Sequence, residues 1–274
     1  MTPPMLPEEI ARRLHAGKPV FGTLVVSTSP RWPEMIRQCG LDFVFIDTEH
    51  VAIDRHQLSW MCQTYAAMGL SPIVRIPSAD STWATMVLDG GASGVIAPYV
   101  ETSQQVRQLR GAVKMRPIKG ATLSRMLDGQ SESDSLDQYL ANVSRQKLLI
   151  VNIESVPAIE ALNEILTEPG LDAVLIGPHD LSCSLGIPEQ YDHPEFLTAC
   201  ETIFRKARAH NVGAGIHYWG NAEEQAAMLE RGANLLIHSA DIKLVQKHLS
   251  AELRQIRHAI GLSDSSPDQS DLAI

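Results

Sequence analysis

The chain has 274 residues, of which 44% are hydrophobic and 20% charged, a composition typical of a soluble globular protein with one large domain or two small ones. Its formal net charge of −9 argues against nucleic acid as a partner, because phosphate binding needs a basic surface. No apolar stretch approaches the roughly 18 residues that a membrane helix needs, and the chain begins without a secretory signal, so we expect a cytoplasmic protein with no membrane partner.

Short apolar runs alternate with helical patterns along the whole chain. Apolar runs bounded by turn residues are typical of strands buried on both faces, and we predict eight of them: 20–26, 42–47, 72–76, 93–97, 148–153, 173–176, 213–217 and 234–238. Helical spacing predicts helices at about 30–39, 55–68, 81–88, 102–113, 157–166, 194–210, 222–231 and 242–260. This alternation favours an α/β protein with a single parallel (β/α)8 TIM barrel. An open doubly wound sheet is the main alternative, although no G-x-G-x-x-G follows the first strand to support a dinucleotide-binding version.

Two segments depart from the alternation. Residues 115–146 are expected to be irregular, and a loop of that length inside a compact domain is usually functional or mobile. Residues 261–274 are rich in Ser and Asp, which predicts a disordered, polar, acidic tail. We therefore expect one barrel domain over residues 1–260, followed by this tail.

Two of the predicted strands lead directly into a carboxylate. The run 147–153 ends at Glu154, and the run 173–176 continues through Gly177-Pro-His-Asp180. Burying an unpaired carboxylate is unfavourable, so both side chains should lie at strand ends beside a partner. In a barrel, the carboxyl ends of the strands meet at one mouth, where two hard oxygen ligands suit a divalent cation such as Mg²⁺ or Mn²⁺. A helix cap for Asp180 and a surface salt bridge for Glu154 form the alternative interpretation.

Other chemically active side chains follow the remaining strands. His50 comes after the second predicted strand, Arg75 ends the third and His217 ends the seventh. A base, a cation and two carboxylates would therefore converge on one mouth. A histidine at a strand end is more often a structural group than a metal ligand. Trp219 follows the seventh strand and either walls the pocket or packs on a neighbouring subunit.

Five segments, taken in order, resemble the signatures of the HpcH/HpaI aldolases, which are class II, pyruvate-type aldolases with a barrel fold. The segments are Asp47-Thr-Glu-His50, Val74-Arg75-Ile-Pro77, Leu88-Asp89-Gly-Gly-Ala92, Ile153-Glu154-Ser155 and Ile176-Gly-Pro-His-Asp180-Leu-Ser182. The resemblance runs from about residue 21 to residue 238. Its most specific part is Gly-Pro-x-Asp-Leu-Ser, taken with the upstream Glu.

The resemblance implies a role for each site residue. Glu154 and Asp180 would be the two protein ligands of a divalent metal (Mg²⁺, Mn²⁺ or Co²⁺), whose other positions belong to water and to a 2-keto acid. Arg75 would lie against the keto oxygen and stabilise the enolate that forms there. His50 would be the general base, and Asp89 would hydrogen-bond to His50 and hold its tautomer.

The resemblance also implies a substrate site and a reaction. Backbone amides around Gly177, Pro178, His179 and Asp180 would bind the pyruvate carboxylate. The reaction would be reversible cleavage of a 4-hydroxy-2-keto acid to pyruvate, or a related 2-keto acid, and an aldehyde, through an enolate that the metal and Arg75 stabilise. The alternatives are an oxaloacetate-type decarboxylase, a citrate-lyase-like or malyl-CoA-like lyase on the same site, and a non-catalytic metabolite-binding barrel.

Three further features concern specificity and assembly. Lys119 and Arg125 lie where relatives carry a glycine- and arginine-rich loop, and they either bind an anionic aldehyde portion or are solvated charges. His179 lies inside the Gly-Pro-x-Asp turn, so we expect it to border the substrate. Relatives often have a small residue at this position, so His179 is a departure that would alter specificity. Family members are commonly hexamers, built as trimers of dimers with an exchanged C-terminal helix, and the amphipathic segment 242–260 is compatible with such an exchange.

Overall fold

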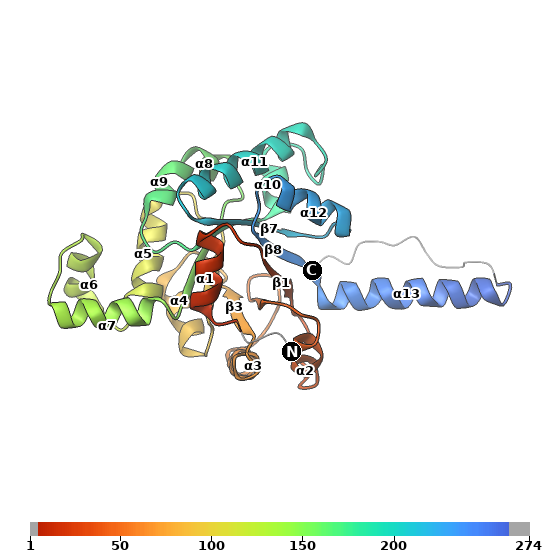
Figure 1. The fold of residues 1–274 in the computed structure, drawn as a ribbon, viewed down its shortest axis with the longest axis horizontal. Helices are drawn as coiled ribbons and strands as arrows, with labels where there is room; N and C mark the ends of the chain where they lie inside the picture. The colour runs from red at the N-terminus through yellow and green to blue at the C-terminus, as the bar shows by residue number, and fades with distance from the viewer. Residues whose placement is uncertain (1–4, 263–274) are drawn as a thin grey trace.

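A computed structural model describes residues 5–262, so nearly all of the predicted tail (261–274) lies outside the described residues. Eight parallel strands form a closed barrel in sequence order, with the last strand paired to the first (Figure 1). The strands are β1 (Val20–Leu24), β2 (Phe43–Asp47), β3 (Ser71–Arg75), β4 (Gly94–Ala97), β5 (Leu148–Asn152), β6 (Ala173–Ile176), β7 (Gly213–Tyr218) and β8 (Leu235–Ala240). The predicted TIM barrel is therefore confirmed.

Helices surround the barrel and connect its strands. They are α1 (Pro7–His15), α2 (Trp32–Arg37), α3 (Arg55–Ala67), α4 (Ser81–Asp89), α5 (Ser103–Lys114), α6 (Gly120–Leu127), α7 (Asp134–Ser144), α8 (Val156–Glu160), α9 (Leu162–Thr167), α10 (Pro178–Ser184), α11 (Pro194–Ala209), α12 (Ala222–Glu230) and α13 (Asp241–Ala259). The sequence did not predict α1, which contacts β1, β5 and β7 and covers one end of the barrel. Within residues 5–262, no helix is long and apolar enough to cross a membrane.

Alternate residues of each strand point into the barrel. This alternation determines which side chains lie at the mouth, the carboxyl end of the barrel. Phe43 and Phe45 of β2 belong to the cluster that fills the interior, whereas Val44 packs with the outer helices. Because side chains alternate along a strand, the next inward position is Asp47, the last residue of β2. The same period brings further polar residues to the mouth: Arg75 of β3, Asn152 of β5 and His217 of β7.

Residues 115–146 are not irregular, which corrects the prediction from the sequence. They contain α6 and α7, which contact α5 and share a small apolar cluster of Met115, Met126 and Leu140. The side chain of Ser133 caps α7 by accepting a hydrogen bond from Leu136 N at 3.3 Å. The helical spacing of the apolar residues is hard to see in the sequence, because glycines and polar residues surround both short helices.

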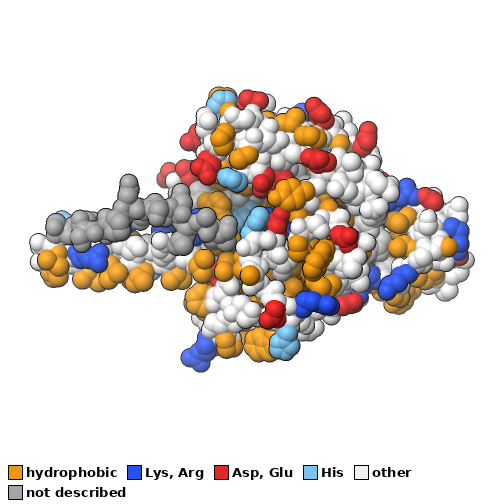
Figure 2. Space-filling view, turned by 180° about the vertical axis from the view of Figure 1, so that it is seen from behind, with side chains coloured by type: hydrophobic (Ala, Val, Ile, Leu, Met, Phe, Trp, Pro, Cys, Tyr) orange, Lys and Arg blue, Asp and Glu red, His pale blue; other side chains and the backbone are white. Residues whose placement is uncertain are grey.

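The two faces of the barrel differ in what they present. Figure 1 looks onto α1, at the amino ends of the strands, and shows α13 extending away from the barrel on the side opposite α6 and α7. The view from behind shows histidine and acidic side chains gathered around a hollow near the middle of the other face (Figure 2). The exposed apolar residues of α13 are Leu244, Val245, Leu249, Leu253 and Ile256.

Candidate active site

A cavity of about 200 Å³ opens at the carboxyl ends of the strands. Residues at or just after the ends of β1, β2, β3, β5, β6 and β7 line it. Six residues predicted from the sequence are among them: His50, Arg75, Gly177, Pro178, His179 and Asp180. Two other predicted residues, Glu154 and Asp89, do not line the cavity. Glu154 lies directly behind its lining residues, whereas Asp89 lies away from it.

Arg75 is held in the pocket wall by Asp47, its partner in the register of β2 and β3. Arg75 Nε donates to Asp47 Oδ1 at 2.8 Å and Nη2 donates to Oδ2 at 2.6 Å. Only 12% of the Arg75 side chain is exposed. Burial would lower the pKa of Arg75, but the hydrogen bonds and charge of Asp47 raise it above its ordinary value. The guanidinium is therefore a fixed positive charge, and the sequence did not predict the carboxylate that orients it.

Glu154 lies behind the lining residues, with only 4% of its surface exposed, and two donors hold its oxygens. Tyr99 N donates to Oε1 at 2.8 Å, and Asn152 Nδ2 donates to Oε2 at 2.9 Å. Tyr99 has a φ of 52°, a left-handed conformation that is uncommon for residues other than glycine. Burial, together with the negative charges of Asp180 and Glu49, raises the pKa of Glu154 to about 7, although the two hydrogen bonds act in the opposite direction. A nearby cation would stabilise the ionised form.

Gly177 brings the two predicted metal ligands together. A methyl group on its Cα would overlap Glu154 Oε2 and lie 3.6 Å from Asp180 Oδ2, so both carboxylates face the same space. With Asp47 and Glu49, the mouth has four carboxylates against the one guanidinium of the pocket wall. This excess of negative charge fits a divalent cation. No group of three His, Cys, Asp or Glu side chains within residues 5–262 could hold a metal, so water and substrate oxygens would have to complete the coordination.

Within a single chain, the structure does not bring Asp89 to His50, so the predicted hydrogen bond between them is not made there. Asp89 is the last residue of α4, forms an ion pair with Arg116 and has 63% of its side chain exposed. Helices of such a barrel run antiparallel to its strands, so the end of α4 lies near the amino ends of the strands, away from the mouth. The carboxylate beside His50 is Glu49, whose Oε2 lies 3.6 Å from His50 Nε2.

Glu49 links His50 to the rest of the site. Its Oε2 also lies 3.1 Å from Arg75 Nε, and the hydroxyl of Tyr99 donates a hydrogen bond to the Glu49 carboxylate. Burial raises the pKa of Glu49, and the positive charge of Arg75 offsets part of that shift. The segment Asp47-Thr-Glu49-His50 contained the signal for this contact, because it places a carboxylate next to the candidate base.

His217 and Trp219 form an aromatic wall of the pocket. Their ring centroids lie 4.6 Å apart, and His217 also packs edge-on against Phe45 at 5.4 Å. Burial lowers the pKa of His217 to about 4, so the ring is neutral and its Nε2 donates to Ser239 O at 3.1 Å. A neutral ring with a backbone partner favours a structural role. His179 lies at the rim, where its Nδ1 is 3.7 Å from an oxygen of Glu189.

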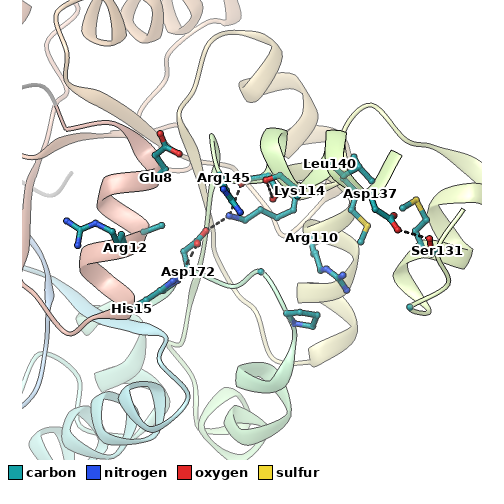
Figure 3. Close-up of a pocket in the computed structure, with 18 of the residues that line it drawn as sticks. Glu8, Arg12, His15, Arg110, Lys114, Ser131, Asp137, Leu140, Arg145 and Asp172 are labelled. Atoms are coloured by element: carbon teal, nitrogen blue, oxygen red, sulfur yellow. Dashed lines mark hydrogen bonds and ion pairs between the residues drawn. The ribbon is translucent and has the colours of Figure 1, made fainter. Parts of the chain in front are cut away.

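A larger cavity, of about 1020 Å³, lies between α1, α5 and α7 (Figure 3). At its centre, Lys114 Nζ pairs with Asp172 Oδ2 at 2.6 Å and donates to the carbonyl of Lys147 at 2.5 Å. His15 Nε2 lies 3.4 Å from Asp172 Oδ1. The amino ends of barrel strands typically serve stability rather than catalysis, and none of the predicted site residues lines this cavity. The smaller cavity is therefore the candidate active site.

Comparisons with known proteins show which family the chain resembles along most of its length. The family model described as HpcH/HpaI aldolase/citrate lyase matches residues 21–247. The 2-keto-3-deoxy-L-rhamnonate aldolases of Shigella boydii and of Escherichia coli K12 are each 30% identical to this chain over 254 residues, which make up 92% of this chain and 94% of each relative. The crystal structure of an HpcH/HpaI aldolase from Desulfitobacterium hafniense has a TM-score of 0.78 at 28% identity and covers 93% of this chain and 98% of its own. The citrate synthase SbnG has a TM-score of 0.77 at 29% identity, covering 91% and 97%.

Proposed function

The chain belongs to the HpcH/HpaI aldolase/citrate lyase family, and on that basis we propose that it reversibly cleaves a 4-hydroxy-2-keto acid to pyruvate, or a related 2-keto acid, and an aldehyde. The enzyme is thus an aldolase, a carbon–carbon lyase that acts on small molecules. One observation carries the proposal. The carboxylates of Glu154 and Asp180 face one space beside Gly177, at the same mouth as Arg75 and His50.

Class II aldolases generally need a divalent metal, and we propose that Glu154 and Asp180 hold Mg²⁺, Mn²⁺ or Co²⁺ in this chain. When bound, the cation supplies a Lewis acid beside the keto group of the substrate. Asn152 and the backbone N–H of Tyr99 orient the Glu154 carboxylate through the two hydrogen bonds to its oxygens. Outer partners of this kind fix the geometry of a metal ligand before the cation arrives.

Arg75 stabilises the negative charge that develops on the keto oxygen. Its contacts with Asp47 and Glu49 use Nε and Nη2, which leaves Nη1 as a donor toward the substrate. Because Asp47 fixes the guanidinium before the reaction, little reorganisation is needed when the enolate forms. Two backbone N–H groups at the start of α10, those of His179 and Asp180, have no partner within the helix and are donors for the pyruvate carboxylate.

His50 accepts the proton of the 4-hydroxyl group. As the proton leaves, the bond between C3 and C4 breaks, C4 becomes the aldehyde carbon, and the electron pair of the broken bond passes into the enolate. Glu49 lies beside His50 and stabilises its protonated form, and it is the neighbouring carboxylate that, from the sequence, we expected Asp89 to provide. In the direction of synthesis the same proton returns from His50 to the new hydroxyl.

A retro-aldol assay tests the proposal. The enzyme is freed of metal with EDTA and assayed for pyruvate release before and after addition of Mg²⁺, Mn²⁺ or Co²⁺. We expect activity only after metal is added, loss of activity in His50→Ala, and near wild-type activity in Asp89→Asn, which serves as the control. Activity that survives complete chelation would contradict the metal assignment, and unchanged activity in His50→Ala would contradict the base.

A citrate synthase is among the similar structures, and this favours a second candidate function. In it, the same site would stabilise an enolate but would form or break its bond to a compound other than an aldehyde. A decarboxylase or a citrate-lyase-like or malyl-CoA-like lyase would use this site as well, and a non-catalytic barrel would use none of it. Pyruvate and aldehyde released in equal amounts support the aldolase. Carbon dioxide release from oxaloacetate without aldehyde supports the decarboxylase.

We also propose that the chain assembles as a hexamer, a trimer of dimers, in which α13 is exchanged between subunits. The support is the row of exposed apolar side chains on α13, a helix that extends away from its own barrel (Figure 1). Light scattering on the full chain tests this, and a monomer at micromolar concentration would reject it. A cytoplasmic location stays a prediction from the sequence.

A further inference from the structure

A lysine from outside the barrel strands reaches the aromatic wall of the active-site pocket. Lys243 lies in the first turn of α13, and its Nζ lies 4.4 Å from the centre of the Trp219 ring. Trp219 lines the pocket and packs against His217. A cation–π contact of this kind positions an ammonium group but leaves its N–H donors free for other acceptors.

The position of Lys243 is fixed by a buried anchor two residues earlier. Both oxygens of Asp241 accept backbone hydrogen bonds from the loop after β1, from Val26 N and from Ser27 N, each at 3.0 Å. Asp241 is buried, so the first turn of α13 is tied to the mouth of its own barrel. Lys243 itself is half-buried, and within residues 5–262 no acidic side chain forms an ion pair with it.

Lys243 and Arg75 both lie close to His217 in the aromatic wall. The positive charges of Arg75 and Lys243 both act on His217, in addition to burial, and lower its pKa. His217 in turn contacts Trp219, the ring over which the Lys243 ammonium group lies. With the keto acid beside Arg75 and the metal ligands, as proposed above, Trp219 is the lining residue through which Lys243 meets the rest of the pocket.

The other candidate cations do not reach the pocket. Arg125 is on α6, where its Nε pairs with Glu132 at 2.6 Å. Lys119 precedes α6, and neither of these residues lines the cavity. Lys243 does not line it either, but its Nζ contacts the ring of Trp219, which does. Lys243 is therefore a basic side chain at the aromatic wall that forms no ion pair with an acidic side chain among the described residues.

We propose that Lys243 and Trp219 form a subsite for an anionic group on the aldehyde portion of the substrate. This inference rests on the proposed aldolase function and extends it: the preferred substrate is a 4-hydroxy-2-keto acid whose distal end carries a carboxylate or a phosphate. Lys243 donates a charge-assisted hydrogen bond to that group, and Trp219 packs against the carbon chain that carries it.

The test is an acceptor series in the direction of synthesis, with pyruvate and saturating Mn²⁺. Two matched pairs of aldehydes separate charge from size: 4-oxobutanoate with butanal, and glyceraldehyde 3-phosphate with glyceraldehyde. In each pair we compare kcat/KM for the anionic aldehyde with kcat/KM for the neutral one. The pair in which this ratio is larger shows whether the subsite prefers a carboxylate or a phosphate. Variants are Lys243→Met, which removes the charge at similar length, and Lys243→Arg, which keeps it. Lys247→Met is the control, with the same charge change one turn further along α13.

We expect the wild-type enzyme to prefer the anionic member of at least one pair. Lys243→Met should lose about 10- to 100-fold in kcat/KM for that anion, mostly through KM, because a hydrogen bond to a charged group is worth roughly that factor. Its kcat/KM for the neutral partner should change less than about threefold. Lys243→Arg should restore most of the preference, and Lys247→Met should resemble wild type.

Two kinds of failure can be told apart. A wild-type enzyme that condenses pyruvate with neutral aldehydes as well as with anionic ones would overturn the subsite and leave the aldolase intact. Equal losses on both members of a pair in Lys243→Met would also overturn it. No condensation with any of the four aldehydes, with metal present, would reject the proposed function itself.

Discussion

At the amino ends of the strands, Lys114 and Asp172 form a buried ion pair, whereas at the carboxyl ends Glu154 and Asp180 lie close together as like charges. The first arrangement is complete within the described chain, since Lys114 also donates to backbone carbonyls and Asp172 accepts from Leu149 N at 2.8 Å. The second is not, because burial and neighbouring carboxylates raise the pKa of Glu154 to about 7.

The difference separates a stabilising charge cluster from a functional one. A buried charge destabilises the fold unless an opposite charge and hydrogen bonds compensate it. Where compensation is missing in a pocket, a ligand or metal can supply it, and such sites are where perturbed pKa values tend to gather. The larger cavity, at the amino ends of the strands, thus gives no indication of a catalytic site. We expect catalysis in the smaller cavity at the carboxyl ends, where carboxylates are in excess.

The strongest test of this contrast removes a carboxylate from the mouth. Glu154→Gln should lower kcat by about 1000-fold or more, because a metal ion at the proposed site would contribute several kcal/mol to stabilising the enolate, and each ~1.4 kcal/mol is tenfold in rate. Its melting temperature should also stop rising when Mn²⁺ is added. Asp172→Asn is the matched control at the other end, and its Mn²⁺-dependent rise should persist. A metal response retained in Glu154→Gln would remove this residue from the ligand set.

Breaking the ion pair at the amino end should affect stability instead of catalysis. Lys114→Met leaves Asp172 buried without its partner and should reduce the free energy of unfolding by about 3–5 kcal/mol, measured by urea denaturation. The pyruvate-releasing activity per folded molecule should be unchanged. Adding Asp172→Asn removes the orphaned charge and should recover most of the loss. A large fall in kcat for Lys114→Met would mean that the two ends are coupled.

His217, at the mouth, makes the free energy of unfolding of the protein depend on pH. Its pKa in the folded protein is about 4, below the ordinary 6.5, so the unfolded chain binds the proton more tightly. Stability is therefore full above pH ~6.5 and falls as the pH decreases toward ~4, by about 3 kcal/mol from this residue. In His217→Gln, the difference in unfolding free energy between pH 7 and pH 4.5 should shrink by most of that amount. An identical pH dependence in both proteins would contradict the buried neutral imidazole.

The smallest expected effect comes from filling the space beside Gly177. The φ of this residue is −88°, so alanine fits the backbone, but its methyl group would overlap Glu154 Oε2. Gly177→Ala should weaken metal binding by about 10- to 100-fold, as displaced outer contacts of metal ligands commonly do. Calorimetric titration with Mn²⁺ measures this directly. Gly90→Ala, in the α4 cap far from the mouth, is the control and should bind metal like wild type.

The part of the site that follows from the sequence is the part that local patterns determine. Apolar runs locate the strands, and the period of two along them places Arg75 at the mouth, while the turn after β6 brings Asp180 there. Asp89 was assigned from a motif, but its side of the barrel depends on the direction of α4, which a motif does not encode. Lys243 was missed for a related reason: it comes from a helix, and only tertiary packing brings it to Trp219.

The anchor at Asp241 has one further consequence. It ties the first turn of α13 to its own barrel through Val26 and Ser27, while the rest of the helix points its apolar residues outward. If that outer part packs on a neighbouring subunit, the same helix, α13, takes part in the subunit interface and also carries Lys243 to the substrate pocket. Separated subunits would then keep the metal ligands and the base but lose discrimination among acceptors, so we expect quaternary structure to tune selectivity more than turnover.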